Sequence, residues 1–210
     1  MTSSRSASVY LSGSWSINFS IGISTTADFI PLILLRRLDW KVKLIIISGL
    51  QTMPITNNVT RFLDSRKVKY AAHELPAEKL GARDVALYLN VPENQVFKTI
   101  VTKREKGKPV LALVPAPCVV DLKLLADFLG EKKMHLPTER EAEQMTGLQA
   151  GGISPLALIN KGFQVVIDLS AQEFDEIYIS GGQRGLNIQL GVKDLAKLVN
   201  ARFAEVSKIL

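Results

Sequence analysis

Two apolar runs joined by one short turn constrain the fold of this chain most strongly. Residues 95–103 (QVFKTIVTK) and 109–115 (PVLALVP) are typical of strands, and Gly107 in the linking segment REKGK suits a tight turn. The pattern predicts a β-hairpin. Lys98 lies within the first run. Because burying an unpaired ammonium is costly, its side chain either turns to solvent or is held for a charged ligand.

Helices and further strands are expected around this hairpin. Thr56 or Asn57 can cap a helix that carries Val59, Phe62 and Leu63 on one face. Further helices are expected over residues 79–90, 121–129 and 138–147 and in the closing segment DLAKLVNARFAEVSKI, and further strands over KVKYAAHEL and residues 163–168, 175–180 and 186–190. Asp121 is a plausible N-cap, and Thr138 with Glu141 makes a T-x-x-E capping box. Helices and strands do not alternate strictly. This order predicts an α/β (α+β) domain, with a mixed sheet or barrel flanked by helices.

Residues 1–52 differ from the rest of the chain. Residues 1–26 are rich in Ser and Thr, and two short apolar runs between residues 29 and 50 are separated by charged residues. Neither run approaches the roughly 18 residues that span a bilayer, and the charges do not follow the order of a signal peptide. We therefore expect an extension that is disordered or not translated, followed by one domain over residues 53–210. A targeting or membrane-surface role for the extension is the alternative.

The composition limits the chemistry. A net charge of +6 permits a polyanionic partner such as RNA without requiring one. With one cysteine, Cys118, and two histidines, His73 and His135, we expect no internal disulfide, no metal site and a cytoplasmic location. Cys118 lies in an apolar stretch, where a core position is commoner than a nucleophile. The sequence has neither a P-loop nor a G-x-G-x-x-G motif, so we expect no nucleotide cofactor.

Three stretches could carry chemistry. Lys98 could bind a phosphate or a polarised carbonyl, although an edge-strand lysine that reaches solvent fits the pattern slightly better. In LQAGGISPLAL (148–158), two glycines allow close approach of a ligand and expose N–H groups, whereas an ordinary loop is the simpler interpretation. In EIYISGGQRGLNIQL (176–190), a loop with Arg184 suits anion recognition, and a plain hairpin loop is the alternative.

Taken together, QVFKTIV, AGGISPL and AQEFDEIYISGGQRGLNIQL resemble the YbaK family of aminoacyl-tRNA deacylases, relatives of the editing domain of bacterial prolyl-tRNA synthetases. The resemblance covers residues 54–209. It implies a compact α/β fold around a mixed, partly barrel-like sheet, and hydrolysis of mischarged tRNA in trans without metal or nucleotide. The implied partners are the 3′-aminoacyl-adenosine end of the tRNA and prolyl-tRNA synthetase, without a membrane.

The resemblance also implies the site residues. Lys98 matches the essential lysine that holds the 3′-terminal adenosine and its phosphate. Gly151 and Gly152 match the loop whose N–H groups approach the aminoacyl carbonyl as an oxyanion hole would. The other positions implied in substrate binding are Leu75, Phe97, Ile153, Ser154, Pro155, Ser180, Gly181, Gly182, Arg184 and Asn187.

Two of these positions depart from the cysteine-clearing branch of the family. Leu75 stands where a tyrosine is usual, and Asn187 where an aspartate is usual. The expected function is therefore deacylation of mischarged tRNA, with Cys-tRNA(Pro) as the first candidate substrate. In that branch, the substrate thiol attacks its own ester and forms a thiolactone. The alternatives are a deacylase of another aminoacyl-tRNA such as Ala-tRNA(Pro), and a non-catalytic module that binds a tRNA end or a nucleotide.

Overall fold

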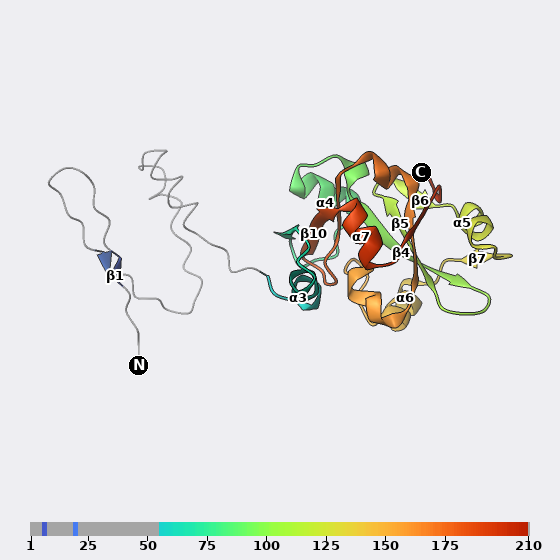
Figure 1. Cartoon of the computed structure of the whole chain (residues 1–210), viewed down its shortest axis with the longest axis horizontal. Helices are drawn as coiled ribbons and strands as arrows, with labels where there is room; N and C mark the ends of the chain where they lie inside the picture. The colour runs from blue at the N-terminus through green and yellow to red at the C-terminus, as the bar shows by residue number, and fades with distance from the viewer. Residues whose placement is uncertain (1–5, 8–18, 21–54, 210) are drawn as a thin grey trace. The chain divides into compact units, whose positions relative to one another are not determined.

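The structure is a computed structural model that describes residues 6–7, 19–20 and 55–209 (Figure 1). The chain divides into two units, 1–52 and 53–210, and each is described by itself. In the first unit, Ser6–Ala7 (β1) pairs antiparallel with Phe19–Ser20 (β2). The rest of the expected extension lies outside the described residues.

The larger sheet of the second unit has five strands in the order β11-β8-β5-β4-β7. Their bounds are Phe97–Arg104 (β4), Val110–Pro115 (β5), Met134–His135 (β7), Gln164–Asp168 (β8) and Arg202–Ala204 (β11). The predicted hairpin is confirmed, since β4 and β5 pair antiparallel. On its other side β5 pairs parallel with β8, and all of its residues are buried, as expected for a central strand.

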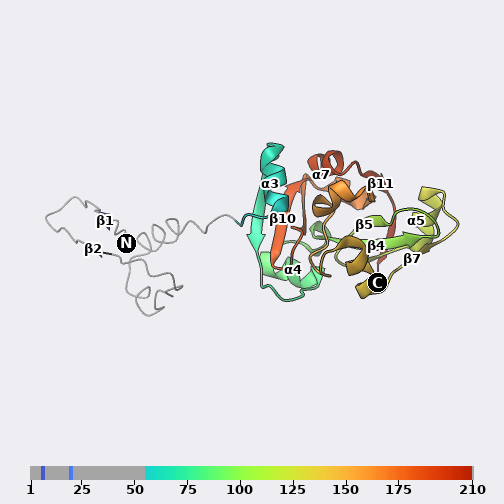
Figure 2. The same ribbon diagram turned by 90° about the horizontal axis from the view of Figure 1, so that it is seen from below.

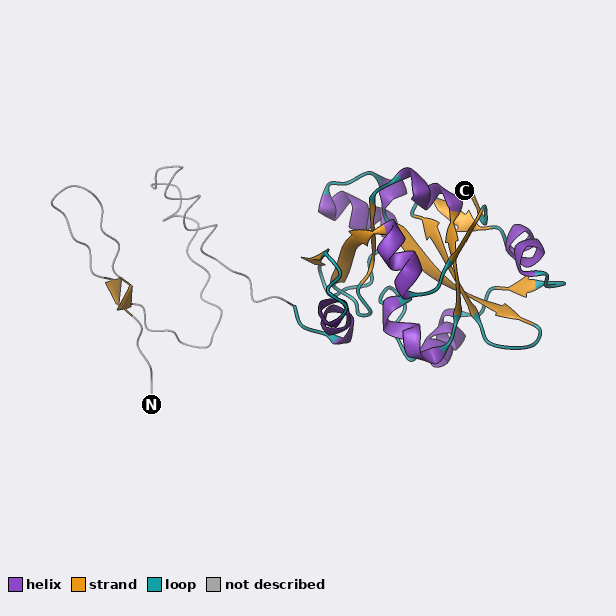
Figure 3. Ribbon diagram, in the orientation of Figure 1, coloured by secondary structure: helices purple, strands orange, loops and turns teal. Residues whose placement is uncertain are grey.

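A second sheet packs beside the first. Its three antiparallel strands, in the order β3-β10-β9, are Tyr70–Glu74 (β3), Leu186–Gly191 (β10) and Glu176–Ser180 (β9). A parallel bridge between Val96 and Tyr178 connects β9 to the start of β4. The largest hydrophobic cluster draws on both sheets, with Leu111 and Leu113 from one and Ile188 from the other. The α+β fold with a mixed sheet flanked by helices is confirmed (Figure 3).

Three of the α-helices begin at side-chain caps that the sequence predicts. The bounds of the α-helices are Asn58–Ser65 (α3), Ala82–Leu89 (α4), Leu122–Leu129 (α5), Glu139–Thr146 (α6) and Val192–Leu198 (α7), with 3₁₀ turns at Glu93–Gln95, Leu156–Lys161 and Leu169–Glu173. The Asn57 side chain accepts hydrogen bonds from the first turn of α3, and Asp121 and Thr138 cap α5 and α6 in the same way. No helix among the described residues is long and apolar enough to cross a membrane.

The closing helix was predicted too long. It ends at Leu198, and Asn200 adopts a left-handed conformation with φ of 48°. The chain then forms β11, which pairs parallel with β8, and Ser207–Ile209 (β12), which pairs antiparallel with Cys118–Val120 (β6). Between them Val206 is fully buried, and its N–H donates to Asp168 Oδ2 at 3.1 Å. These tertiary contacts override the helical pattern of the sequence.

Candidate active site

A pocket of about 410 Å³ lies between β4, α4 and the loops that flank α6. Figure 1 shows β4 and β5 running through the middle of the domain, with α4 and α6 on either side of them. The pocket brings together Lys98, Phe97, Gly151, Ile153, Ser180 and Asn187, which belong to the three stretches singled out in the sequence. Residues far apart in the chain thus form one concave site.

Lys98 supplies the positive charge of the pocket. Its half-buried ammonium donates a hydrogen bond of 3.0 Å to the main-chain carbonyl of Ala116. Burial lowers the pKa of Lys98, and the nearby positive charge of Arg83 lowers it further, while Cys118 acts in the opposite direction. Strand β7 pairs with β4 only at Lys103 and Arg104, so the Lys98 end of β4 lines the pocket.

The two glycines of the AGGISP loop have different roles. Gly151 lines the pocket with φ of 86°, and its N–H makes no hydrogen bond within the described part of the chain. The N–H of Gly152 already donates to the carbonyl of Gln149 at 2.9 Å. A Cβ on Gly152 would lie 2.8 Å from the main-chain carbon of Gln183. Gly151 therefore offers a free donor, and Gly152 allows two loops to pack closely.

Side chains from neighbouring loops hold the AGGISP loop in place. The carbonyl of Ala150 accepts a hydrogen bond of 2.7 Å from Arg184 Nε, and the N–H of Ala150 donates to Glu143 Oε1 at 2.8 Å. Arg184 is not among the pocket-lining residues. The structure thus places this arginine behind the loop, where it orients the peptide before Gly151.

Strands β9 and β10 form a polar wall of the pocket. Ser180 and Asn187 are register partners, and Asn187 is only 6% exposed. Ser180 Oγ, Asn187 Oδ1 and Thr99 Oγ1 are buried and have no hydrogen-bond partner within the described chain. An unpaired buried polar atom costs about 1–3 kcal/mol, so such atoms are usually paired. These three oxygens are available to hydrogen-bond donors of a ligand.

Several predicted site residues lie around this pocket and do not line it. Leu75 lines a small adjacent hollow that it shares with Gly151 and Asn187. Pro155 lines a separate hollow, and Ser154 is fully buried. The remaining two, Gly181 and Gly182, pack against Leu186 and against Val59 and Ala157, and the Gly181 carbonyl accepts a hydrogen bond from Asn57 Nδ2 at 2.9 Å. They hold the β9–β10 loop against α3.

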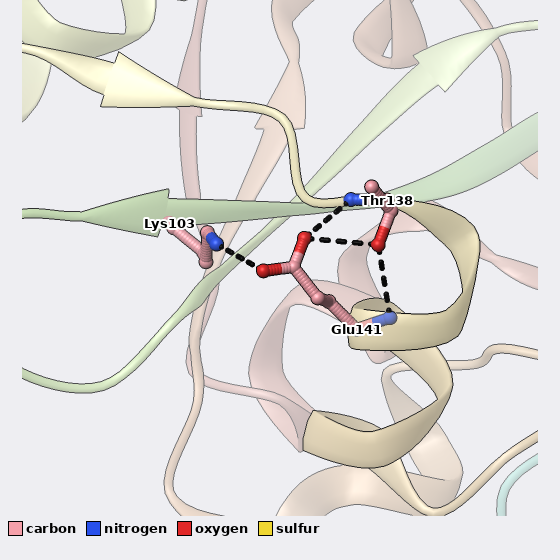
Figure 4. Close-up of polar contacts among 3 residues, drawn as sticks. All are labelled: Lys103, Thr138 and Glu141. Atoms are coloured by element: carbon pink, nitrogen blue, oxygen red, sulfur yellow. Dashed lines mark hydrogen bonds and ion pairs between the residues drawn. The ribbon is translucent and has the colours of Figure 1, made fainter.

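A polar cluster fastens the start of α6 to β4 (Figure 4). Glu141 accepts hydrogen bonds from Lys103 Nζ at 2.8 Å and from the N–H of Thr138 at 2.7 Å. The hydrogen bond from Lys103, followed by those from Thr138, lowers the pKa of the Glu141 carboxyl from 4.5 to about 2. Because α6 leads into the AGGISP loop, this cluster helps to position that loop beside the strand of Lys98.

Sequence reasoning missed Arg83 and Thr99. Arg83 lies on α4, where its guanidinium forms an ion pair with Glu93 at 3.3 Å and adds positive potential near Lys98. Only the packing of α4 shows which of its faces meets the pocket. Thr99 lines the pocket together with Lys98, although the side chains of adjacent strand residues point to opposite faces.

The single cysteine and the histidines lie outside the pocket lining. Cys118 is half-buried on β6, His73 Nε2 lies 3.1 Å from Gln189 Oε1, and His135 is exposed on β7. Among the described residues, no group of three or more His, Cys, Asp or Glu side chains is placed to hold a metal ion.

Comparison with known proteins shows the class to which this fold and site belong. A family model described as "Aminoacyl-tRNA editing domain" matches residues 76–198. The chain belongs to this family, of the YbaK/EbsC type, and the resemblance seen in the sequence motifs is confirmed.

Individual relatives agree with this assignment. EbsC of Enterococcus faecalis, by its name a candidate Cys-tRNA(Pro)/Cys-tRNA(Cys) deacylase, is 34% identical over 152 residues, which is 71% of this chain and 92% of that protein. A proline–tRNA ligase of Streptococcus thermophilus is 29% identical over 105 residues, half of this chain and 17% of the ligase. A crystal structure described as a candidate trans-editing enzyme for prolyl-tRNA synthetase has the same fold, with a TM-score of 0.62, 24% identity, and coverage of 73% of this chain and 99% of that one.

Proposed function

We propose that this protein hydrolyses mischarged aminoacyl-tRNA in trans, beside prolyl-tRNA synthetase, and that Cys-tRNA(Pro) is its substrate. The observation that carries the proposal is the meeting of the Lys98 ammonium and the free N–H of Gly151 in one pocket of about 410 Å³. The name of the E. faecalis relative supports the choice of a cysteinyl substrate. The domain over residues 53–210 carries this activity in the proposal.

Lys98 binds the 3′-terminal nucleotide in this proposal. An ammonium has three donors, and the hydrogen bond to Ala116 uses one of them. The other two remain for a phosphate or ribose oxygen. The charge of Arg83 also acts at this place, although its ion pair with Glu93 offsets part of that charge.

The aminoacyl group lies between the AGGISP loop and the polar wall. The N–H of Gly151 donates to the ester carbonyl oxygen, where negative charge develops during attack. The unpaired oxygens of Ser180 and Asn187 accept hydrogen bonds from the α-ammonium of the amino acid. These contacts fix the ester so that the reacting atoms are held close together.

The substrate thiol is the nucleophile in this proposal. A sulfur–carbon bond forms at the ester carbonyl, the bond from that carbon to the ribose 3′ oxygen breaks, and the thiol proton ends on the departing 3′ hydroxyl. The pocket lining fits this route, since among its residues there is no cysteine or histidine and its one carboxylate, Glu139, is ion-paired with Lys79. The enzyme then supplies position and charge stabilisation.

Deacylation of Cys-tRNA(Pro), Ala-tRNA(Pro) and Pro-tRNA(Pro) by the full chain tests the proposal. We expect Cys-tRNA(Pro) to be cleared, Pro-tRNA(Pro) to be spared, and a thiolactone to appear before free cysteine. Clearance of Ala-tRNA(Pro) instead would contradict the thiol route and show that a water is the nucleophile. Binding of all three aminoacyl-tRNAs without turnover would contradict the proposed enzymatic activity and favour a non-catalytic module that binds tRNA ends.

A further inference from the structure

A second hollow, of about 620 Å³, lies between the end of α3, the segment that follows it and α7. Figure 2 shows α3 at one end of the domain, α7 between α3 and the middle, and α5 at the other end. We call this hollow the basic groove; its lining residues are Phe62, Arg66, Lys67, Val68, Lys69, Ile159, Asp194, Lys197 and Leu198. None of them lines the Lys98 pocket.

The basic groove concentrates positive charge. It has four basic side chains and one carboxylate, Asp194, for a net charge of +3. Residues 53–210 contain 21 Lys and Arg and 18 Asp and Glu, also a net charge of +3. The rest of this domain is therefore neutral on balance, and its excess charge lies in one hollow.

The cations of the basic groove are also unneutralised. Among the described residues, Arg66, Lys67, Lys69 and Lys197 form no ion pair, and all four are exposed. Five basic side chains elsewhere on the domain, Lys79, Arg83, Lys103, Arg104 and Lys208, are paired with carboxylates. The Arg66 guanidinium lies 5.4 Å from the centroid of the Phe62 ring, which keeps it at the wall of the groove.

We infer that the basic groove binds the phosphodiester backbone of RNA, namely the acceptor stem of the tRNA whose 3′ end enters the Lys98 pocket. This inference rests on the proposed function for its choice of RNA. Lysines bind phosphates as flexible point charges, and their contacts contribute affinity without reading sequence. A concave surface fits a protruding backbone better than it fits a flat membrane.

The path between the two sites suits a tRNA end. Ser180 lines the Lys98 pocket, and the next residue, Gly181, accepts the hydrogen bond from Asn57 at the start of α3. Helix α3 has 8 residues and is thus about 12 Å long, and Arg66 follows at its other end. A few unpaired nucleotides can cover this distance, so the double-stranded stem would begin near the basic groove.

Charge reversal in the full chain tests the inference. The variant Lys67→Glu/Lys69→Glu is compared with Lys123→Glu/Lys132→Glu, which changes the net charge equally with two exposed lysines near α5. The probe is tRNA(Pro) without an attached amino acid, and its binding is titrated over a range of salt concentrations. We expect the groove variant to bind about tenfold or more weakly, and the slope of log K against log salt to fall by about 2, one for each lost phosphate contact. The matched variant should bind as the wild type does.

A second readout separates the groove from the pocket. With cysteinyl-adenosine, which has no phosphodiester backbone to reach the basic groove, the groove variant should keep the wild-type rate, whereas with Cys-tRNA(Pro) its KM should rise. Equal weakening by both double variants, or an equal loss of rate on cysteinyl-adenosine, would overturn the inference. Tight binding of the wild type to phosphatidylserine vesicles but not to tRNA would also overturn the inference. If no substrate is turned over and the groove variant alone loses tRNA affinity, the proposed function is wrong and the RNA-binding role of the basic groove is supported.

Discussion

The Lys98 ammonium donates a hydrogen bond of 3.0 Å to the main-chain carbonyl of Ala116, 18 residues further along the chain. The N–H of Ala116 donates in turn to the carbonyl of Val96 at 2.8 Å, so the segment after β5 is held in register with the start of β4. The backbone of the hairpin thus orients the charge before a substrate arrives. Such preorganisation lowers the cost of placing a cation where negative charge must be bound.

Replacing Lys98 with methionine separates function from stability. We expect deacylation to fall at least about 100-fold, because the cation that binds the 3′ end is lost. Burial lowers the pKa of Lys98, so at neutral pH the charged form is less favourable in the folded chain than in the unfolded chain. The melting temperature should therefore stay equal or rise. Thermal melts and initial rates check this, and a less stable but active variant would contradict it.

Wild-type activity should also decline at high pH through Lys98. Because its pKa is lowered, the ammonium loses its proton at a lower pH than an ordinary lysine does. We expect the KM for Cys-tRNA(Pro) to rise as pH increases through this lowered pKa, with an increase that is absent from Lys98→Met. Steady-state kinetics between pH 7 and 10, corrected for spontaneous ester hydrolysis, test the expectation.

The Asn187→Asp variant restores the carboxylate that the cysteine-clearing branch usually carries. A charged acceptor binds the α-ammonium more strongly than an amide does, so KM should fall roughly fivefold at neutral pH. The gain should disappear as pH falls and the new carboxyl is protonated. The matched Asn187→Leu variant should raise KM instead. No change in KM for either variant would show that the polar wall formed by β9 and β10 does not contact the amino acid.

Gly152→Ala should disrupt the loop that carries Gly151. The added Cβ would lie 2.8 Å from the Gln183 main-chain carbon and 2.9 Å from the Arg184 nitrogen, so the two loops must move apart. We expect a loss of roughly 1–3 kcal/mol in the free energy of unfolding, together with most of the activity.

Gly130→Ala is the control for this loss of stability. Gly130 has φ of 71° and nothing within 4 Å of an added Cβ, so alanine there should cost only the left-handed conformation, roughly 1–2 kcal/mol. Its activity should match that of the wild type. Denaturant unfolding and initial rates compare the two variants, and equal activity in both would contradict the proposed role of the loop contact.

Glu141 should make stability depend on pH. The folded-state pKa of its carboxyl, about 2, lies below the ordinary value of 4.5, so its contribution is fully present above about pH 4.5 and is lost as pH falls toward 2. Glu141→Gln should therefore lower the melting temperature at pH 7, and the difference from the wild type should shrink below pH 4.5. Melts at a series of pH values measure this, and a constant difference would contradict it.

Local signals were sufficient for most elements of the fold. The caps at Asn57, Asp121 and Thr138 and the β4–β5 hairpin depend on residues close in sequence, and the structure confirms them. The short strands β6, β7, β11 and β12 were missed because long-range pairing defines them. Their segments have no periodicity of their own that could distinguish them from loops or helix.

The candidate site was predictable in part. The resemblance to the YbaK family, and not the residue pattern alone, selected Lys98, Gly151, Ser180 and Asn187, and the fold brings these four residues to one pocket. The sequence could not show that Arg184 holds the loop from behind, because this depends on a hydrogen bond between segments 34 residues apart. The basic groove was equally hidden, since α7 meets the segment after α3 only in the folded domain.

The most direct test of the role of Lys98 is the initial rate of Cys-tRNA(Pro) deacylation by the wild type, Lys98→Ala and the matched exposed-lysine variant Lys123→Ala. We expect the wild type and Lys123→Ala to clear the ester equally fast, and Lys98→Ala not to exceed the rate in buffer. Clearance by Lys98→Ala at the wild-type rate, or no clearance by the wild type, would contradict this role.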